Sequence, residues 1–115
     1  MSFNEIDLKR IDKEMKTFIS RQRTSVEIES GVDISYIIEK DSIIIFETSP
    51  AWDNPEEDVE VPIARATFVK ADESWKIFYQ KDDDRWHKYE PLPEVKTFGE
   101  FLKEVAEDKH GYFWG

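Results

Sequence analysis

Apolar and polar side chains alternate through the middle of this 115-residue chain, between residues 32 and 90. Val32, Ile34 and Tyr36, for example, occupy every second position of one run. A period of two is typical of a β-strand that buries one face. The pattern predicts about five strands, over residues 32–39, 43–46, 61–71, 75–80 and 85–90. Most of their connections are three or four residues long, which favours antiparallel neighbours.

The chain before these strands has the spacing of a helix. Ser2 and Glu5 are placed as a capping box, in which each side chain binds a backbone N–H at a helix start. The apolar residues that follow fall on one stripe, at Leu8, Ile11, Met15 and Phe18. The sequence predicts a helix that ends near residues 21–23, where basic side chains suit the negative end of the helix dipole.

A second helix is predicted after the strands. Thr97 and Glu100 form another capping box, and Gly111 is the expected stop. The apolar residues again follow helical spacing, at Phe98, Phe101, Leu102 and Val105. The tail, residues 112–115, is too aromatic for a free end, so we expect it to dock on the domain.

Two amphipathic helices need one sheet face to cover, which predicts an α+β fold in two layers. The expected order is an N-terminal helix, an antiparallel sheet of about five strands and a C-terminal helix. One domain over residues 1–115 accounts for the length. With 4 Trp, 4 Tyr and 8 Phe, the chain can build a core without disulfides. The longest connection, residues 49–58, is predicted as a mobile loop.

The net charge of −10 is unevenly distributed. Residues 24–74 carry 13 acidic and 3 basic residues, which places the acidity in the first half of the sheet. Such a segment repels phosphate backbones and anionic lipid surfaces, so neither nucleic acid nor a membrane is an expected partner. It permits a basic protein partner, although acidity that merely maintains solubility explains the same charge.

Several classes of chemistry lack their motifs. There is no cysteine, and the four glycines are isolated, which disfavours thiolate catalysis and phosphate-binding loops. His87 and His110 are the only histidines, and the acids of the 49–58 loop lack the spacing of a calcium site. We therefore expect no metal and no cofactor. The N-terminus has no signal-peptide pattern, which predicts a cytoplasmic protein.

Arg65 is the only basic residue between Lys40 and Lys70. If its strand face is buried, a carboxylate such as Asp53 or Glu47 must pair with it, because an unpaired buried charge costs several kcal/mol. Otherwise its planar fork is suited to an anionic ligand.

The four tryptophans are expected mostly to pack in the core. Trp52 is the exception, because it lies in the proline-containing loop beside a charge and is suited to anchor an interface. The candidate set for binding a protein partner or a small ligand is Trp52, Asp53, Arg65, Trp86, His87 and Tyr89. No catalytic residue is assigned.

Several runs together resemble a known family. They include residues 45–47, 50–55, 62–68, 75–78 and 86–91, which contain the Trp-Asp-Asn-Pro and Trp-His-Lys-Tyr-Glu-Pro sequences. The chain resembles the bacterial domain-of-unknown-function family numbered 3024 over nearly its whole length. The resemblance implies a bacterial protein. It implies no catalytic residue, since the family has no established activity.

Three hypotheses of function follow. The favoured one is a non-enzymatic domain that binds a protein partner or a small ligand. The second is an acidic immunity or inhibitor protein for a basic partner, as the charge of residues 24–74 allows. The third is an enzyme in which His87 acts as a general base near Asp53 or Glu90. The oligomeric state is left open.

Overall fold

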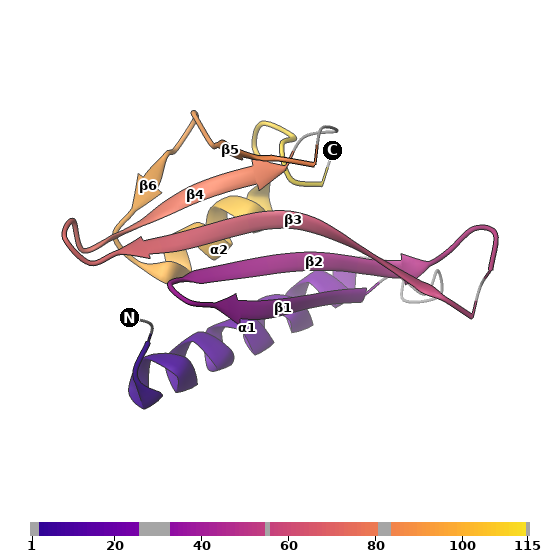
Figure 1. Ribbon diagram of the computed structural model, residues 1–115, viewed down its shortest axis with the longest axis horizontal. Coiled ribbons are helices and arrows are strands. Elements are labelled where there is room, and N and C mark those ends of the chain that lie inside the picture. The colour runs from indigo at the N-terminus through magenta and orange to yellow at the C-terminus, as the bar shows by residue number, and fades with distance from the viewer. Residues whose placement is uncertain (1–2, 26–32, 55, 81–83, 115) are drawn as a thin grey trace.

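The computed structural model describes residues 3–25, 33–54, 56–80 and 84–114, and within them it contains one antiparallel sheet and two helices. The sheet order is β1-β2-β3-β4-β5, with β6 paired to β4 (Figure 1). The helices are α1 (Glu5–Ser25) and α2 (Phe98–Glu107). The strands are β1 (Asp33–Glu39), β2 (Ser42–Pro50), β3 (Asp58–Val69), β4 (Ser74–Gln80), β5 (Trp86–Lys88) and β6 (Glu94–Val95).

Both helices lie on one face of the sheet, which confirms the predicted α+β fold in two layers (Figure 1). Helix α1 contacts β1, whereas α2 contacts β3, β4 and β6. Strand β6 was not predicted, because two prolines beside it, Pro91 and Pro93, indicated a break in the sheet. It pairs through Glu94 and Val95 with Lys76 and Trp75.

The core lies between the helices and the sheet. The strand register aligns Ile43, Ala66 and Ile77 across three strands, and all three are fully buried. The alanines of β3 leave room for the large side chains that α2 brings to the sheet, such as Phe101. The opposite face of the sheet is not covered by either described helix.

Helix α1 begins two residues later than predicted. The backbone N–H of Asp7 donates to the side chain of Asn4, and the Asn4 N–H lies 3.4 Å from the Asp7 carboxylate. This reciprocal cap replaces the predicted Ser2–Glu5 box, in which Ser2 lies outside the described residues. Leu8 is 37% exposed, so it does not join the buried stripe of this helix. The other predicted stripe residues are buried, namely Ile11, Met15 and Phe18.

Helix α2 begins as predicted, because the Thr97 hydroxyl accepts a hydrogen bond from the Glu100 N–H. Its end differs from the prediction. Asp108, rather than Gly111, ends the helix in the left-handed region, with φ 42°. Gly111, with φ 68°, shapes the turn that follows.

The aromatic tail docks on the domain, which confirms the prediction for residues 112–114. The Asp108 carboxylate accepts hydrogen bonds from the backbone N–H groups of Phe113 and Trp114, at 3.1 and 2.9 Å. The Trp114 indole N–H donates to the Val105 carbonyl. Phe113 is buried and its ring lies 4.9 Å from that of Tyr89.

Substituting Asp108 tests whether this carboxylate fixes the tail. We expect Asp108→Ala to lower the free energy of unfolding by about 1–3 kcal/mol, because two backbone donors lose a charged acceptor. Urea unfolding followed by far-UV circular dichroism measures the loss. Asp108→Gly relieves the left-handed backbone but also removes the acceptor, and it should be nearly as destabilised. A glycine variant as stable as the wild type would assign the effect to backbone conformation instead.

Strands β2 and β3 continue past the body of the sheet as an arm, residues 47–60, along which β1 pairs with β2 only as far as Thr48 (Figure 1). The pairing runs to Pro50 opposite Asp58, so the predicted loop over residues 49–58 is shortened to residues 51–57. The register shifts between Ile45 and Phe46, which introduces an irregularity where the arm leaves the body. The arm extends the molecule along its longest dimension, 45 Å.

Candidate functional site

The structure distributes the predicted site residues over three separate regions. One region is the tip of the β2–β3 arm, the second is the open face of the sheet, and the third is the helix-covered side. Trp52 and Asp53 lie at the tip of the arm. Arg65 and Trp86 lie on the open face of the sheet, and His87 and Tyr89 lie on the helix-covered side. They do not line one shared pocket.

The tip of the arm holds Trp52 in the solvent. Its side chain is 96% exposed, whereas Trp75 in β4 is only 7% exposed. The backbone beneath it is tied by hydrogen bonds, from Ala51 N–H to the Glu57 carbonyl at 2.8 Å and from Glu57 N–H to the Asn54 carbonyl at 3.0 Å. The Asn54 side chain also accepts from the Glu56 N–H. The tryptophan is therefore displayed on an internally bonded turn.

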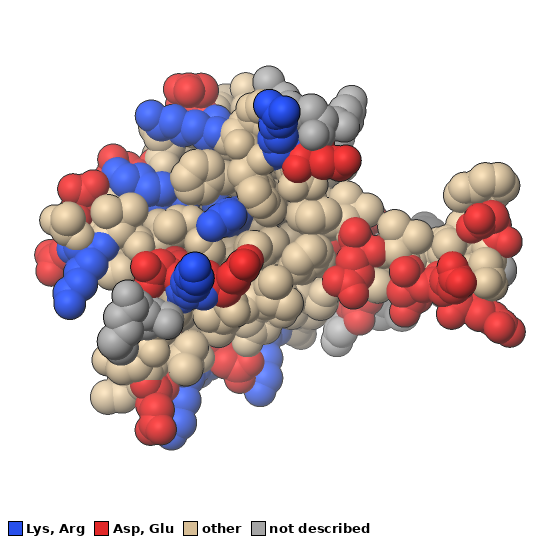
Figure 2. Space-filling view, in the orientation of Figure 1, with Lys and Arg blue, Asp and Glu red and all other residues tan. Residues whose placement is uncertain are grey.

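The arm is acidic throughout. Residues 47–60 contain six acidic residues and no Lys or Arg. These acids are Glu47, Asp53, Glu56, Glu57, Asp58 and Glu60. Figure 2 shows acidic side chains along the projecting end and no basic ones there, whereas both signs are mixed over the body. Val59 and Val61 are 44% and 45% exposed on the same strand, so the arm also presents apolar surface.

Arg65 lies in the middle of β3 on the open face of the sheet, between Ile44 of β2 and Phe78 of β4. Its Nε donates to the hydroxyls of Ser42 and Thr67, at 3.2 and 3.3 Å. Among the described residues, Arg65 forms no ion pair with Asp53 or Glu47, so the predicted pair is absent.

The geometry explains why that ion pair does not form. Glu47 is opposite Ile34 and Val61, on the helix side of the sheet, and Asp53 is out on the arm. The side chain of Arg65 is only half-buried, so water reaches part of it and no carboxylate is required. Its two Nη groups have no hydrogen-bond partner within the described part of the chain, and this fork is suited to a carboxylate ligand.

Trp86 is opposite Gln80 on the same open face and is half-buried. His87 is opposite Tyr79 on the other face, and their ring centroids lie 5.9 Å apart.

Tyr89 is a core residue. It is fully buried, and its hydroxyl donates to the Glu104 carboxylate at 2.8 Å. Burial, together with this carboxylate, raises the pKa of Tyr89. Glu104 is itself buried in α2, with the ammonium of Lys109 4.0 Å from its other oxygen. The sequence did not reveal this buried pair, because a buried acidic residue between apolar helix positions cannot be distinguished by sequence from one that is exposed to solvent.

No group of three or more His, Asp or Glu side chains is arranged to hold a metal among the residues that the structure describes. Within the same residues, neither helix combines the length and the apolar character that crossing a membrane requires.

Comparison with known proteins identifies the family. The model of the domain of unknown function DUF3024 matches residues 3–115, so the chain belongs to this family. No curated protein and no solved structure shows a significant match.

Proposed function

We propose that this member of the DUF3024 family is a binding module that docks on a protein partner through the tip of its β2–β3 arm. The observation that supports the proposal is the 96% exposure of Trp52 on a hydrogen-bonded turn. An exposed tryptophan in an ordered position is an anchor that loses little side-chain entropy on binding.

The size of the tryptophan sets the scale of the interaction. Burying its side chain removes roughly 150–250 Å² from water. At about 25 cal/mol per Å², this corresponds to about 4–6 kcal/mol before the costs of association are subtracted. Val59 and Val61 extend the apolar surface along the same arm.

The charge of the arm specifies the chemistry of the partner. Six acids without a compensating Lys or Arg disfavour an acidic surface and steer the arm toward a basic one. The partner we propose has an apolar pocket for Trp52 inside a rim of Lys and Arg. If that partner is a basic enzyme, the same contact supports the inhibitor function.

Site-specific cross-linking tests this proposal. A photo-reactive phenylalanine derivative is placed at Val59 on the arm or at Ile37, which is 46% exposed on β1. We expect cross-links to another protein from position 59 only, and we expect Trp52→Ala to abolish them. Cross-links that survive Trp52→Ala would remove the anchor from the proposal.

The captured protein then allows a quantitative measurement. Calorimetry should show that Trp52→Ala weakens the complex at least ~30-fold, the effect of an interface hot spot. Ile37→Ala, which removes an exposed apolar side chain elsewhere on the sheet, serves as the matched control and should leave the Kd unchanged. Adding the domain to the partner in an activity assay decides between simple binding and inhibition.

A further inference from the structure

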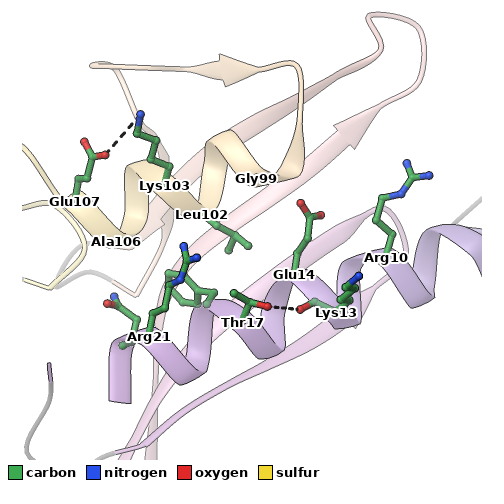
Figure 3. Close-up of a pocket in the computed structure, with 12 residues that line it drawn as sticks. Arg10, Lys13, Glu14, Thr17, Arg21, Gly99, Leu102, Lys103, Ala106 and Glu107 are labelled. Atoms are coloured by element: carbon green, nitrogen blue, oxygen red, sulfur yellow. Dashed lines mark hydrogen bonds and ion pairs between the residues drawn. The ribbon is translucent and has the colours of Figure 1, made fainter. Parts of the chain in front are cut away.

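A groove separates the two helices on the covered side of the domain (Figure 3). Its volume is about 770 Å³. Phe18 of α1 and Leu102 of α2 contribute apolar walls, and Figure 3 shows the Leu102 side chain directed toward α1. A second hollow of about 440 Å³ lies beside the first along α1 and shares Arg10 and Glu14 with it.

The rim of this groove is basic, in contrast to the rest of the chain. Four cations line it, and they are contributed by both helices, namely Arg10, Lys13, Arg21 and Lys103. The two lining acids have neighbours that offset their charge. Glu107 lies 3.4 Å from Lys109, which is outside the groove lining, and 3.9 Å from Lys103, so it also offsets part of the Lys103 charge. Glu14 lies against the N-terminus of α2, where a Cβ on Gly99 would be 3.3 Å from its Oε1 atom.

We propose that this groove receives the tip of the β2–β3 arm from a second copy of the chain. The inference depends on the proposed function of the arm as a docking element. The chain itself carries the complement of the groove, a projecting acidic segment with one exposed tryptophan. Trp52 would contact the apolar walls formed by Phe18 and Leu102, while the acids of the arm face the cations of the rim.

An arm on one copy meets a groove on the next, so the arrangement either closes on itself, with a two-fold pair that exchanges arms as the smallest case, or continues from copy to copy. The tip of the arm lies at the far end of the longest dimension of the molecule, away from the body that carries the groove (Figure 1). Two copies joined by a single contact leave one arm and one groove unoccupied between them. Contacts of this type propagate head to tail unless the rotation closes a ring.

Complementation between two variants tests the inference. The arm variant is Trp52→Ala, and the groove variant combines Lys13→Glu with Lys103→Glu, one change on each helix. Sedimentation measures the mass of each protein at increasing concentration, up to about 1 mM. We expect the wild type to associate as its concentration rises, and each variant alone to remain a monomer. An equal mixture should form a 1:1 dimer that does not grow, because only one arm and one groove remain functional.

A charge-matched control separates the groove from net charge. Lys9→Glu combined with Lys88→Glu changes the charge equally, but neither residue lines the groove, so this variant should associate like the wild type. Circular dichroism checks that every variant is folded. A groove variant that fails to fold is replaced by Lys13→Gln with Lys103→Gln, for which we expect at least a tenfold rise in Kd.

Three results would overturn the inference: a wild type that stays monomeric throughout, an arm variant that still associates, or a mixture that stays monomeric. The proposed function has a separate readout. If the wild type is monomeric but Trp52-dependent cross-links to another protein persist, docking between copies is wrong and the arm remains a binding element. If, in addition, the cross-links are unchanged in the Trp52→Ala variant, both proposals fail.

Discussion

Replacing Trp75 by alanine is expected to lower the free energy of unfolding by about 3–5 kcal/mol, the usual range for truncating a buried aromatic residue. Trp75 is 7% exposed, and its ring lies between those of three phenylalanines. The centroid distances are 5.5 Å to Phe3, 5.2 Å to Phe68 and 5.1 Å to Phe98. A domain of this size is stabilised by about 5–15 kcal/mol in total, so the variant loses a large share of it.

Trp52→Ala is the matched comparison, because the same substitution is made at a side chain that is 96% exposed. Its free energy of unfolding should stay within about 0.5 kcal/mol of the wild type. Urea unfolding followed by far-UV circular dichroism compares both variants without depending on tryptophan fluorescence. A loss of more than about 1 kcal/mol at Trp52 would show that the arm tip packs on the body in solution, and it would remove the basis for the anchor.

The alternation and capping patterns predicted the body of the fold because they are local consequences of burial. The period of two in residues 32–39 identifies a strand with one face against the helices, and Ile34 is indeed buried there. The Thr97 cap was predicted for the same reason, since the hydroxyl and the N–H that it binds lie within one turn. Short connections then fixed antiparallel neighbours.

The arm could not be predicted because its strands lack the alternation of apolar and polar side chains that indicates a strand. Residues 47–50 and 58–60 carry mostly polar or acidic side chains, so the sequence indicates a loop there. The backbone nevertheless pairs from Ile45 to Pro50, since an antiparallel ladder needs only backbone N–H and carbonyl groups. The exposure of Trp52 follows from this extension, whereas the expectation of an anchor at that residue rested on its position in a loop beside a charge.

The groove between the helices was also outside the reach of sequence reasoning. Its cations are separated by many residues, and only the packing of α1 beside α2 places Lys13 and Lys103 on one rim. The buried pair of Tyr89 and Glu104 has the same origin, because the two residues belong to elements that meet only in the folded chain. Spacing along one helix or strand carries no information about such pairs.

Tyr89→Phe is expected to lower the free energy of unfolding by about 1.5–3 kcal/mol at pH 7, because the Glu104 carboxylate loses a buried hydrogen-bond donor. The ring is retained, so no large cavity forms. Glu104→Gln keeps a carbonyl acceptor for the Tyr89 hydroxyl and should be less destabilised. Urea unfolding measures both variants, and a phenylalanine variant as stable as the wild type would show that the carboxylate is satisfied without Tyr89.

The same hydrogen bond makes stability depend on alkaline pH. Burial and the Glu104 carboxylate raise the pKa of Tyr89 above its ordinary value of 10.0. The folded state therefore keeps this proton at a pH where the unfolded chain has released it. The stabilisation is fully present below about pH 10 and is lost as the pH rises toward the raised pKa of the folded state. The slope from one such group reaches about 1.4 kcal/mol per pH unit.

Tyr36 contributes in the same alkaline range and provides the internal control. Burial and the hydrogen bond to Asp12 raise the pKa of Tyr36 to about 12. Between pH 10 and 11.5, Tyr89→Phe should therefore reduce the loss of stability with pH without abolishing it. Combining it with Tyr36→Phe should flatten the curve further, since neither phenylalanine can ionise. If Tyr89→Phe leaves the slope of the wild type unchanged, Tyr89 ionises in the folded protein as easily as in the unfolded chain, and its hydroxyl is not sequestered with Glu104.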